Sequence, residues 1–501
     1  MDDLHPSAKP TAVPSKLIAE LQQIVGSPYV LITPAERRVY ECDACLLVQA
    51  PPDVIVLPNT TRQVAEVVAC CQAYKVPFTP RGGGTGTSGG ALAIEAGVLI
   101  SLNRMTRLIE LNVAQRWVRV EVGMVNAWLN ETLAEHGLFY APDPSSQVAC
   151  TIGGNIAENA GGIHCLKYGV TSDHVLGMTV VLPSGEIQTL GGLTRRAAHR
   201  TLEGHPNMLG LMIGSEGTLG VVTEVTLRLT PKPQATRVWL TAFKKLETAT
   251  KTVEAILLAG LIPSALEMMD AFTVRCVNEA FDVGFPESCE AVLLIELDGS
   301  LAWVEAQGRQ LLAILEQHNP DGFRQEAEAP EARAQLWHAR KSAVAAYGRL
   351  QPAFYVHDCV VPRSQLTPVL QTIIAIGERH RVPIGNVFHA GDGNLHPNIL
   401  FNPADADMVA RVLAAGDEIL AACVAAGGTL SGEHGIGLEK NQHMGLVFNQ
   451  ADLLAMQQVR TWYNPTGRCN PGKVFPSPKA CSGHGPRTLD AGRAQGTGLW
   501  I

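Results

Sequence analysis

Two short stretches in the second half of the chain carry residue types that can act together in chemistry. Residues 387–398 place His389 and His396 around a Gly-Asp-Gly turn after a strand-like run, so the two imidazoles can fold back toward one point. Residues 428–437 add a carboxylate, Glu433, directly before His434. Two imidazoles and one carboxylate are a common ligand set for a divalent ion. Two separate turns with solvent-facing histidines fit the same spacing, which does not decide between the two interpretations.

A cationic candidate precedes these turns, in residues 337–341, which we predict to be helical. The planar guanidinium of Arg340 can bind a carboxylate through two parallel hydrogen bonds. A lone arginine on a helix is more often a surface residue. Together with the histidine and glutamate turns, however, Arg340 becomes a candidate for holding a small anionic substrate.

The elements that must position this chemistry are organised around a glycine-rich run at residues 80–91. Glycine is used where a ligand approaches the main chain closely, and consecutive N–H groups in such loops bind anions. The run lies between apolar segments, at residues 54–58 and 97–102, which argues against a flexible linker. It lacks the Lys-Ser/Thr pair of a Walker loop, and no long helix begins inside it as in a dinucleotide fingerprint. We therefore expect it to bind a phosphorylated cofactor.

Two further stretches fit the same site. Residues 142–147 and 151–162 have small side chains at nearly every position, which leaves room for a flat ligand against the backbone. The alternative is a small-residue helix packed tightly against a sheet. Residues 167–173 precede a predicted hairpin, with strands at 175–182 and 187–190 around a Pro-Ser-Gly turn. Residues 214–227 alternate into a strand that ends before Pro231-Lys232-Pro233, where we place a domain boundary.

The composition restricts the class of protein. With 501 residues and 46% hydrophobic content, the chain is expected to fold into two or more domains. The net charge of -8 argues against nucleic-acid binding as the main purpose. The first residues resemble no secretory leader and no apolar stretch is long enough to cross a bilayer, so we expect a cytoplasmic protein. The twelve cysteines are scattered, and the CxxC at residues 42–45 has no second pair nearby, so an iron–sulfur centre would have to come from another chain.

The three glycine-rich pieces, in this order, resemble the FAD-binding domain of the vanillyl-alcohol-oxidase type of flavoproteins, also called the PCMH fold. The resemblance covers about residues 53–230 and implies an α+β fold, with an FAD-binding domain of two α+β subdomains. Many members tether FAD through a histidine in the first loop, and this loop has none. We therefore predict noncovalent FAD. The cofactor-binding residues implied are Pro80, Arg81, Gly82, Gly83, Gly84, Thr85, Gly86, Thr87, Ser88, Gly89, Gly90, Pro142, Asp143, Thr151, Gly153, Gly154, Asn155, Ala157, Asn159, Gly161, Gly162, Gly169, Thr171, Glu216, Gly217, Gly220, Val222 and Lys473.

The C-terminal part is similar to the D-2-hydroxyacid dehydrogenase branch of these flavoproteins. That branch includes D-lactate dehydrogenases, D-2-hydroxyglutarate dehydrogenases and the FAD-linked subunit of glycolate oxidase. Residues 337–341 and 358–363 of this chain most resemble the glycolate oxidase subunit. The resemblance implies the following roles: His389, His396 and Glu433 bind a divalent metal (zinc, manganese or iron), His434 is the general base, Arg340 receives the substrate carboxylate and Asn398 is a substrate-side polar group.

The same resemblance bears on the substrate and on Lys473. Val356 stands where hydroxyglutarate-specific members have a lysine for the distal carboxylate, which weakens the case for a dicarboxylic substrate. Lys473, in an Asn-Pro-Gly-Lys turn, is expected to contact the flavin, where a point charge would stabilise the reduced ring; a plain terminal turn is the alternative. We thus expect oxidation of glycolate or D-lactate to the 2-oxo acid by hydride transfer to flavin N5. A noncatalytic flavin-binding subunit and a metal-dependent hydrolase are the alternatives.

The expected organisation follows the motifs. We predict a helical lead-in at residues 1–50, the FAD-binding domain at 51–232 and an α+β substrate, or cap, domain at 233–420. A segment at 421–476 returns to complete the active site and the FAD domain, and residues 477–501 are predicted to be a disordered tail. The resemblance also implies possible partners, a paralogous flavin subunit and an iron–sulfur subunit, through which the protein could lie at the periphery of the inner membrane.

Overall fold

The structure is a computed structural model that describes residues 13–193 and 207–476. The predicted tail at 477–501 and the first part of the predicted lead-in lie outside these ranges. Within the predicted helical lead-in lies α1 (Ser15–Val25), which buries Leu17, Leu21 and Val25 at helical spacing. Short elements follow it: η1 (Ser27–Tyr29), β1 (Val30–Leu31) and α2 (Pro34–Arg38).

A four-stranded sheet holds the glycine-rich run. Its order is β1, β2 (Val54–Val56), β4 (Val98–Ser101) and β3 (Phe78–Arg81), and β2, β4 and β3 are parallel. Every residue of β2 and β4 is buried, as parallel strands covered on both faces require. Helix α3 (Thr61–Ala73) connects β2 to β3 and buries Val64, Val67 and Val68. The glycine-rich run therefore leaves the carboxyl end of a parallel strand, a usual place for ligand binding.

A five-stranded antiparallel sheet follows, in the order β5 (Leu108–Asn112), β6 (Trp117–Glu121), β10 (Val221–Arg228), β8 (Val175–Val181) and β9 (Ile187–Gly191). The predicted hairpin is confirmed, with Val181 opposite Ile187 across its turn. The elements between β6 and β8 are α4 (Asn126–Ala134), β7 (Leu138–Phe139), α5 (Ile152–Glu158), α6 (Cys165–Tyr168) and η2 (Thr171–Asp173). Helix α8 (Met208–Met212) precedes β10, and β11 (Thr230–Pro231) pairs with β7.

The second half of the chain is built on a nine-stranded sheet. Its path is β15 (Arg324–Ala327), β12 (Ala235–Phe243), β14 (Ala291–Gly299), β13 (Ala265–Asp270), β18 (Ile384–His389), β19 (Asn394–Leu395) and β17 (Cys359–Val360), and β20 (Pro397–Phe401) joins β18 to β16 (Ala353–Val356). Alternate residues of β12 enter two different cores: Trp239 and Phe243 pack on one face, and Val238 and Leu240 on the other.

Helices cover both faces of this sheet. The core of Trp239 includes side chains of α9 (Leu246–Leu258), α11 (Leu301–His318), α14 (Leu366–His380) and α15 (Ala406–Ala425). The opposite core includes side chains of α10 (Ala271–Phe281), α12 (Pro330–Lys341) and α13 (Ala343–Tyr347). Short turns η3 (Arg363–Gln365) and η4 (Asn441–Leu446) complete this part. None of the helices in residues 13–193 and 207–476 combines the length and apolarity needed to cross a bilayer.

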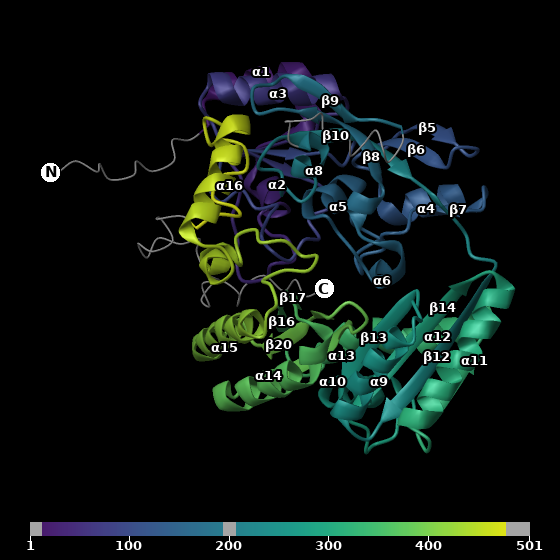
Figure 1. The fold of residues 1–501 in the computed structure, drawn as a ribbon. Helices are drawn as coiled ribbons and strands as arrows, with labels where there is room; N and C mark the ends of the chain where they lie inside the picture. The colour runs from purple at the N-terminus through teal and green to yellow at the C-terminus, as the bar shows by residue number, and fades with distance from the viewer. Residues whose placement is uncertain (1–12, 194–206, 477–501) are drawn as a thin grey trace.

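The C-terminal segment leaves this second half and packs against the first. Figure 1 shows α16 (Gln450–Tyr463) in yellow beside the purple N-terminal elements; its Tyr463 packs on the core of the first half, while Leu453 and Met456 still pack on the core of Trp239. Beyond α16, the Asn470 N–H donates to the Phe78 carbonyl, and the Asn470 amide donates to the carbonyls of Gly90 and Glu216. Residues that follow α16 thus support the glycine-rich run on the side away from the cavity.

Candidate active site

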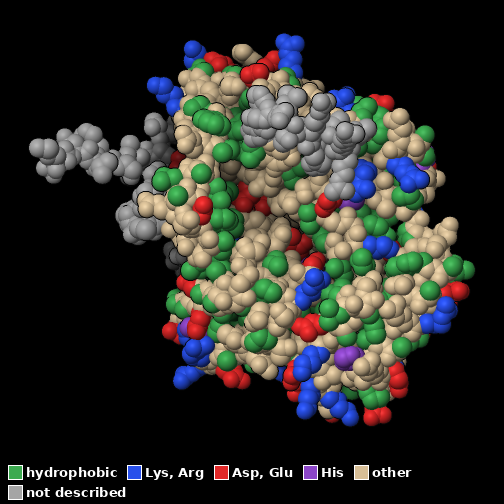
Figure 2. Space-filling view, in the orientation of Figure 1, with side chains coloured by type: hydrophobic (Ala, Val, Ile, Leu, Met, Phe, Trp, Pro, Cys, Tyr) green, Lys and Arg blue, Asp and Glu red, His purple; other side chains and the backbone are tan. Residues whose placement is uncertain are grey.

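A cavity of about 710 Å³ lies between the two halves of the molecule. Its upper wall comes from the glycine-rich pieces, and its lower wall from α12, β16, β18, β20 and the loop that carries Glu433. Figure 2 shows acidic side chains gathered in the hollow between the halves. The cavity therefore brings together segments from both ends of the sequence.

The glycine-rich wall is bare backbone because its segments approach one another too closely for side chains. A Cβ on Gly82 would lie 2.4 Å from the Thr151 hydroxyl, and a Cβ on Gly83 would lie 2.6 Å from the Ala149 carbonyl. Gly153 is pressed in the same way against Val122. Polar atoms of this wall, including Thr87 Oγ1 and Asn155 Nδ2, have no hydrogen-bond partner within the described chain. A bare backbone with unpaired polar groups is suited to the phosphates and ribityl chain of FAD.

This close approach predicts a steric effect of substitution at Gly83. We expect Gly83→Ala to destabilise the apoprotein by about 1–3 kcal/mol, because the backbone at Ala149 cannot yield as a flexible side chain would. The purified variant should also contain less flavin. Gly86→Ala is the matched control for the stability effect, since a Cβ there meets no atom within 4 Å. Thermal melting of the two apoproteins, together with the ratio of flavin to protein absorbance, measures both effects; equal melting of the variants would contradict the steric explanation.

Most of the predicted cofactor residues line the cavity. Those that do are Pro80, Arg81, Gly82, Gly83, Gly84, Thr85, Gly86, Thr87, Gly90, Asp143, Thr151, Gly153, Gly154, Asn155, Ala157, Gly161, Glu216, Gly217, Gly220 and Val222. The structure does not place Ser88, Gly89, Pro142, Asn159, Gly162, Gly169, Thr171 or Lys473 on its surface. Several of these support the wall from behind: the Thr171 hydroxyl donates to the Ala160 carbonyl (2.7 Å), and the Pro142 carbonyl accepts from Asn126 (2.9 Å).

Lys473 lies deeper than the sequence suggested. Its side chain is fully buried, and its ammonium group donates to the carbonyl of Leu92 and to the Asn470 side chain. Burial lowers the pKa of Lys473 to about 8. The contacts observed for this lysine are therefore with the back of the glycine-rich loop.

Glu216 connects the upper wall to the loop of the general-base candidate. Its backbone has a φ of 51°, which is unusual for a residue other than glycine, and its carboxylate accepts from the N–H groups of Ile436 (2.7 Å) and Gly437 (2.6 Å). Glu158, which the sequence did not single out, also lines the cavity. A Cβ on Gly435 would lie 2.2 Å from Glu158 Oε2 and 3.0 Å from Glu216 Oε1. Burial and the neighbouring Glu216 raise the pKa of Glu158 well above its usual value.

The structure brings the three predicted metal ligands to one point. Nε2 of His389 and Nε2 of His396 each lie 3.2 Å from Oε1 of Glu433. The two rings are 5.0 Å apart and nearly perpendicular. Burial opposes ionisation of Glu433, but the two histidines hold its pKa well below the usual range. His389 comes from the end of β18, His396 lies between β19 and β20, and Glu433 follows α15 along the chain.

Glu267, which the sequence did not single out, contacts both a predicted metal ligand and the predicted carboxylate-binding arginine. It lies on β13 directly opposite His389 of β18, and its Oε1 is 2.7 Å from His389 Nδ1. Its Oε2 accepts from Nε of Arg340 (2.8 Å), and Arg340 also lines the cavity. An Nδ1–H donated to Glu267 leaves Nε2 of His389 free to ligate an ion. A single charge within the apolar run 265–269 is the signal that would have identified it.

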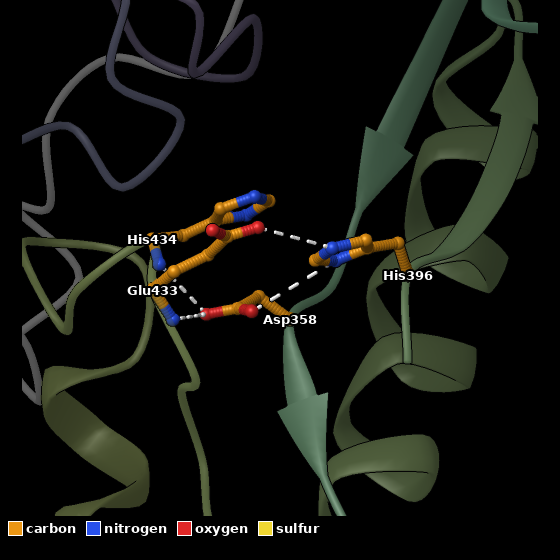
Figure 3. A group of neighbouring side chains, drawn as sticks. All are labelled: Asp358, His396, Glu433 and His434. Atoms are coloured by element: carbon orange, nitrogen blue, oxygen red, sulfur yellow. Dashed lines mark hydrogen bonds and ion pairs between the residues drawn. The ribbon is translucent and has the colours of Figure 1, made fainter. Parts of the chain in front are cut away.

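Asp358 is the second missed residue, and it holds the loop that carries Glu433 and His434 (Figure 3). Its Oδ2 accepts from the Ser431 hydroxyl (2.6 Å) and from the N–H groups of Gly432 (2.8 Å), Glu433 (3.0 Å) and His434 (2.8 Å). Burial opposes its ionisation, but His434 and Lys440 keep the pKa of Asp358 well below its usual value. The possible ligand atoms of Asp358, His396, Glu433 and His434 lie within 4.8 Å of one another, so this group shares His396 and Glu433 with the predicted metal ligands and does not include His389.

His434 lies beside the ligand cluster and on the cavity wall. Its ring is stacked on that of His396, with centroids 5.0 Å apart and an interplanar angle of 3°. Burial lowers the pKa of His434, which favours the neutral imidazole that a general base requires. Its Nδ1 is enclosed by protein, with no hydrogen-bond partner in the ranges that the structure describes. Nε2 is therefore the ring nitrogen available to a ligand.

The remaining candidates meet on two paired strands. Val356 of β16 lies opposite Asn398 of β20, and both line the cavity. The Asn398 amide donates to the His396 carbonyl (2.7 Å), which leaves its side-chain oxygen for another partner. Val344 and Phe354 also line the cavity, so part of its lower wall is apolar.

Comparison with known proteins gives consistent matches along the chain. Residues 52–191 match the family model "FAD binding domain", and residues 232–474 match "FAD linked oxidases, C-terminal domain". The chain is 40% identical over 478 residues to "Glycolate oxidase subunit GlcD" of Escherichia coli (strain K12), covering 95% of this chain and 94% of that protein. It is 32% identical over 432 residues to "D-lactate dehydrogenase [cytochrome], mitochondrial" of Arabidopsis thaliana, covering 86% and 74% respectively.

Solved structures agree on the fold. The 4-ethylphenol oxidase from Gulosibacter chungangensis superposes with a TM-score of 0.77 over 93% of this chain and 98% of that one, at 18% sequence identity. The resemblance to PCMH-type FAD-binding proteins that the three glycine-rich pieces suggested is confirmed by this match and by the family models.

Proposed function

Because the chain belongs to the family of FAD-linked oxidases, we propose that it oxidises a small D-2-hydroxy acid, glycolate or D-lactate, to the 2-oxo acid. The names of its relatives support this substrate class. The observation that carries the proposal is that Arg340, His434 and the cluster of His389, His396 and Glu433 line the same cavity as the glycine-rich wall. A cation, a base and a ligand set beside a flavin site are what oxidation of an α-hydroxy carboxylate requires.

Arg340 holds the substrate carboxylate in this proposal. Glu267 engages one edge of its guanidinium and fixes its orientation, while further N–H donors of the group remain for the substrate. Phe354 and Val356 present apolar side chains to the cavity, and Val356 stands where hydroxyglutarate-specific members of the family have a lysine for the distal carboxylate. We therefore place the substrate among the short monocarboxylic 2-hydroxy acids.

His434 removes the proton of the 2-hydroxyl at its Nε2. Asp358 accepts from the backbone N–H groups of His434 and of Glu433 before it, and the stacked ring of His396 limits the rotation of the His434 ring. The glycine-rich wall would hold FAD, whose N5 would supply the acceptor for the hydride of the substrate Cα. His389, His396 and Glu433 would hold a divalent ion (zinc, manganese or iron), which lowers the pKa of an alcohol that it binds.

Anaerobic stopped-flow reduction of the purified flavoprotein tests the proposal. We expect glycolate or D-lactate to bleach the oxidised flavin, and D-2-hydroxyglutarate to do so more slowly, because Val356 stands where hydroxyglutarate-specific members have a lysine for the second carboxylate. Treatment with a chelator should reduce the rate, and added zinc or manganese should restore it. A flavin that none of the three acids bleaches would contradict the substrate class, and a rate insensitive to the chelator would contradict the metal.

We also propose noncovalent FAD and partner subunits. The glycine-rich run at 80–91 contains no histidine that could tether the ring, so acid precipitation should release the flavin into the supernatant. The E. coli relative is named as a subunit, which supports assembly with a second flavin subunit and an iron–sulfur subunit that accept the electrons. Within the described residues, Cys42 and Cys45 of the CxxC are free thiols, and Cys45 is buried, so the iron–sulfur centre in this proposal belongs to the partner.

A further inference from the structure

Helix α12, which carries Arg340, is held by two buried carboxylates of one sheet face. Glu267 on β13 lies opposite Leu294 of β14, and Glu296 of β14 lies opposite Ala265. Since alternate residues of paired strands share a face, Glu267 and Glu296 point to the same side, where α12 packs. Glu267 accepts from Arg340, and Glu296 Oε2 accepts from Nε1 of Trp337 at 3.0 Å. Trp337 and Arg340 are three residues apart, so the two carboxylates fix one turn of the helix.

Each carboxylate also contacts the ring of a histidine, and the two histidines come from different parts of the chain. His389 contacts Glu267 from within the nine-stranded sheet. His164 contacts Glu296 from the other half of the molecule, where it lies between α5 and α6, with Nε2 3.1 Å from Glu296 Oε1. Nδ1 of His164 is 2.7 Å from Oδ2 of Asp143. Because Asp143 lines the glycine-rich wall, His164 bridges that wall to the carboxylate that holds Trp337.

We propose that His164 is a positioning residue, which fixes α12, and with it Arg340, against the FAD-binding wall. This inference rests on the proposed function in one respect, that Arg340 holds the substrate carboxylate. The chain Asp143–His164–Glu296–Trp337 joins the wall to the helix through hydrogen bonds, and both of its ends line the cavity. A displacement of about 1 Å between substrate and flavin reduces rates up to roughly 100-fold, so a rigid connection here affects catalysis without touching the substrate.

The charges of the bridge fit this role. His164 faces two carboxylates, Asp143 in the loop before α5 and Glu296 on β14. The neighbouring Lys167 forms an ion pair with Asp298 instead. Burial alone would lower the pKa of His164, but the two carboxylates raise it well above its usual value. The imidazolium thus links two carboxylates that would otherwise face each other across the domain boundary. Ser264 donates to Glu296 as well, at 3.1 Å, so this carboxylate has partners on three elements.

Kinetics of flavin reduction in His164→Gln test the positioning role. We expect kcat/KM for the best 2-hydroxy acid to fall roughly 10- to 100-fold, with KM raised and kcat lowered together, since the substrate is held but misplaced. Trp337→Phe, which keeps an aromatic ring and removes the Nε1 donor, should likewise raise KM and lower kcat. Tyr168→Phe is the matched control: it removes a 2.6 Å hydrogen bond to Asp298 across the same boundary, at a residue outside the cavity wall. It should lower stability and leave both constants unchanged.

Hydrogen exchange provides an arm that does not depend on the substrate. Amides of residues 330–341 should exchange faster in His164→Gln than in wild type, and at the wild-type rate in Tyr168→Phe. If none of the hydroxy acids bleaches the flavin of wild type, the proposed function fails, and hydrogen exchange alone then tests whether His164 fixes α12. Equal exchange over 330–341 in His164→Gln and wild type, or kinetics of His164→Gln equal to those of Tyr168→Phe, would overturn the positioning role.

The sign of the pH dependence is a further readout. A histidine with a raised folded pKa contributes its full stabilisation below its unfolded pKa of about 6.5 and loses it as pH rises through the folded value. The melting temperature of wild type should therefore exceed that of His164→Gln by the largest margin near pH 6, and the margin should shrink in alkaline buffer. A margin that is independent of pH would contradict the charged bridge.

Discussion

Replacement of His434 by glutamine should lower the limiting rate of flavin reduction by roughly two to four orders of magnitude, the usual loss when a general base is removed. Glutamine keeps a polar side chain of similar size and cannot accept the proton at neutral pH. The binding of substrate should change less, because Arg340 is held independently by Glu267. Single-turnover reduction at saturating substrate measures the chemical step separately from binding.

The result for His434 distinguishes the base from the ligand cluster. If His434→Gln acts only on proton removal, its metal content should equal that of wild type, and the rate loss should shrink when the pH is raised. His396→Gln should instead lower both the rate and the metal content, since its Nε2 lies at the Glu433 carboxylate. Full flavin reduction by His434→Gln at the wild-type rate would exclude this histidine as the base.

Replacement of Asp358 by alanine should destabilise the protein by roughly 3–5 kcal/mol, the range for removing one partner of a buried ion pair. Asp358 and Lys440 are both completely buried, with 3.9 Å between Oδ2 and Nζ, so the variant removes one of the two carboxylates beside the ammonium group and leaves only Glu439, at 3.7 Å. It also leaves the N–H groups of Gly432, Glu433 and His434 without their acceptor. We expect the loop to become mobile and flavin reduction to be lost together with stability.

A conservative variant separates the charge of Asp358 from its hydrogen bonds. Asp358→Asn retains an acceptor oxygen for the loop and removes the charge, so it should lose less stability than alanine and still position His434 in part. Asp407→Ala is the control, because its carboxylate is 83% exposed and its pair with Arg411 is worth no more than about 1 kcal/mol. Chemical denaturation and flavin reduction of the three variants test this order. An alanine variant as stable as Asp407→Ala would contradict the anchoring role.

The glycine-rich wall could be predicted from sequence because its signal is local. Backbone that must approach a ligand or another segment requires glycine whatever the rest of the fold does, and Gly82 and Gly83 carry that requirement in the sequence itself. The helix α1 and the β8–β9 hairpin were also predictable, since their periodicity and turn residues are local. The stretch at 151–162 satisfied both interpretations: it includes the short helix α5 and still lines the cavity.

The contacts of Glu267 and Asp358 join segments that are far apart in the sequence, and no local pattern contains such contacts. Glu267 reaches His389 only because β13 and β18, far apart in sequence, pair at that position. Asp358 was overlooked because its partners are backbone N–H groups of a loop more than seventy residues away. The contacts of Lys473 could not be predicted either: its motif is conspicuous, but its buried ammonium group donates to the Leu92 carbonyl, and its contact with flavin stays a prediction. Long-range pairing decides these contacts, and a single sequence does not reveal it.

The return of the C-terminal segment has a consequence for how the protein is made. Asn470 and Lys473 complete the support of the glycine-rich run, through Phe78, Gly90 and Leu92. A chain emerging from the ribosome folds its N-terminal portion first, so the glycine-rich run has no such support until residues 470–473 have been synthesised. Loading of the flavin into its final site is therefore expected to follow synthesis, and a nascent chain stalled before residue 464 should not retain the cofactor.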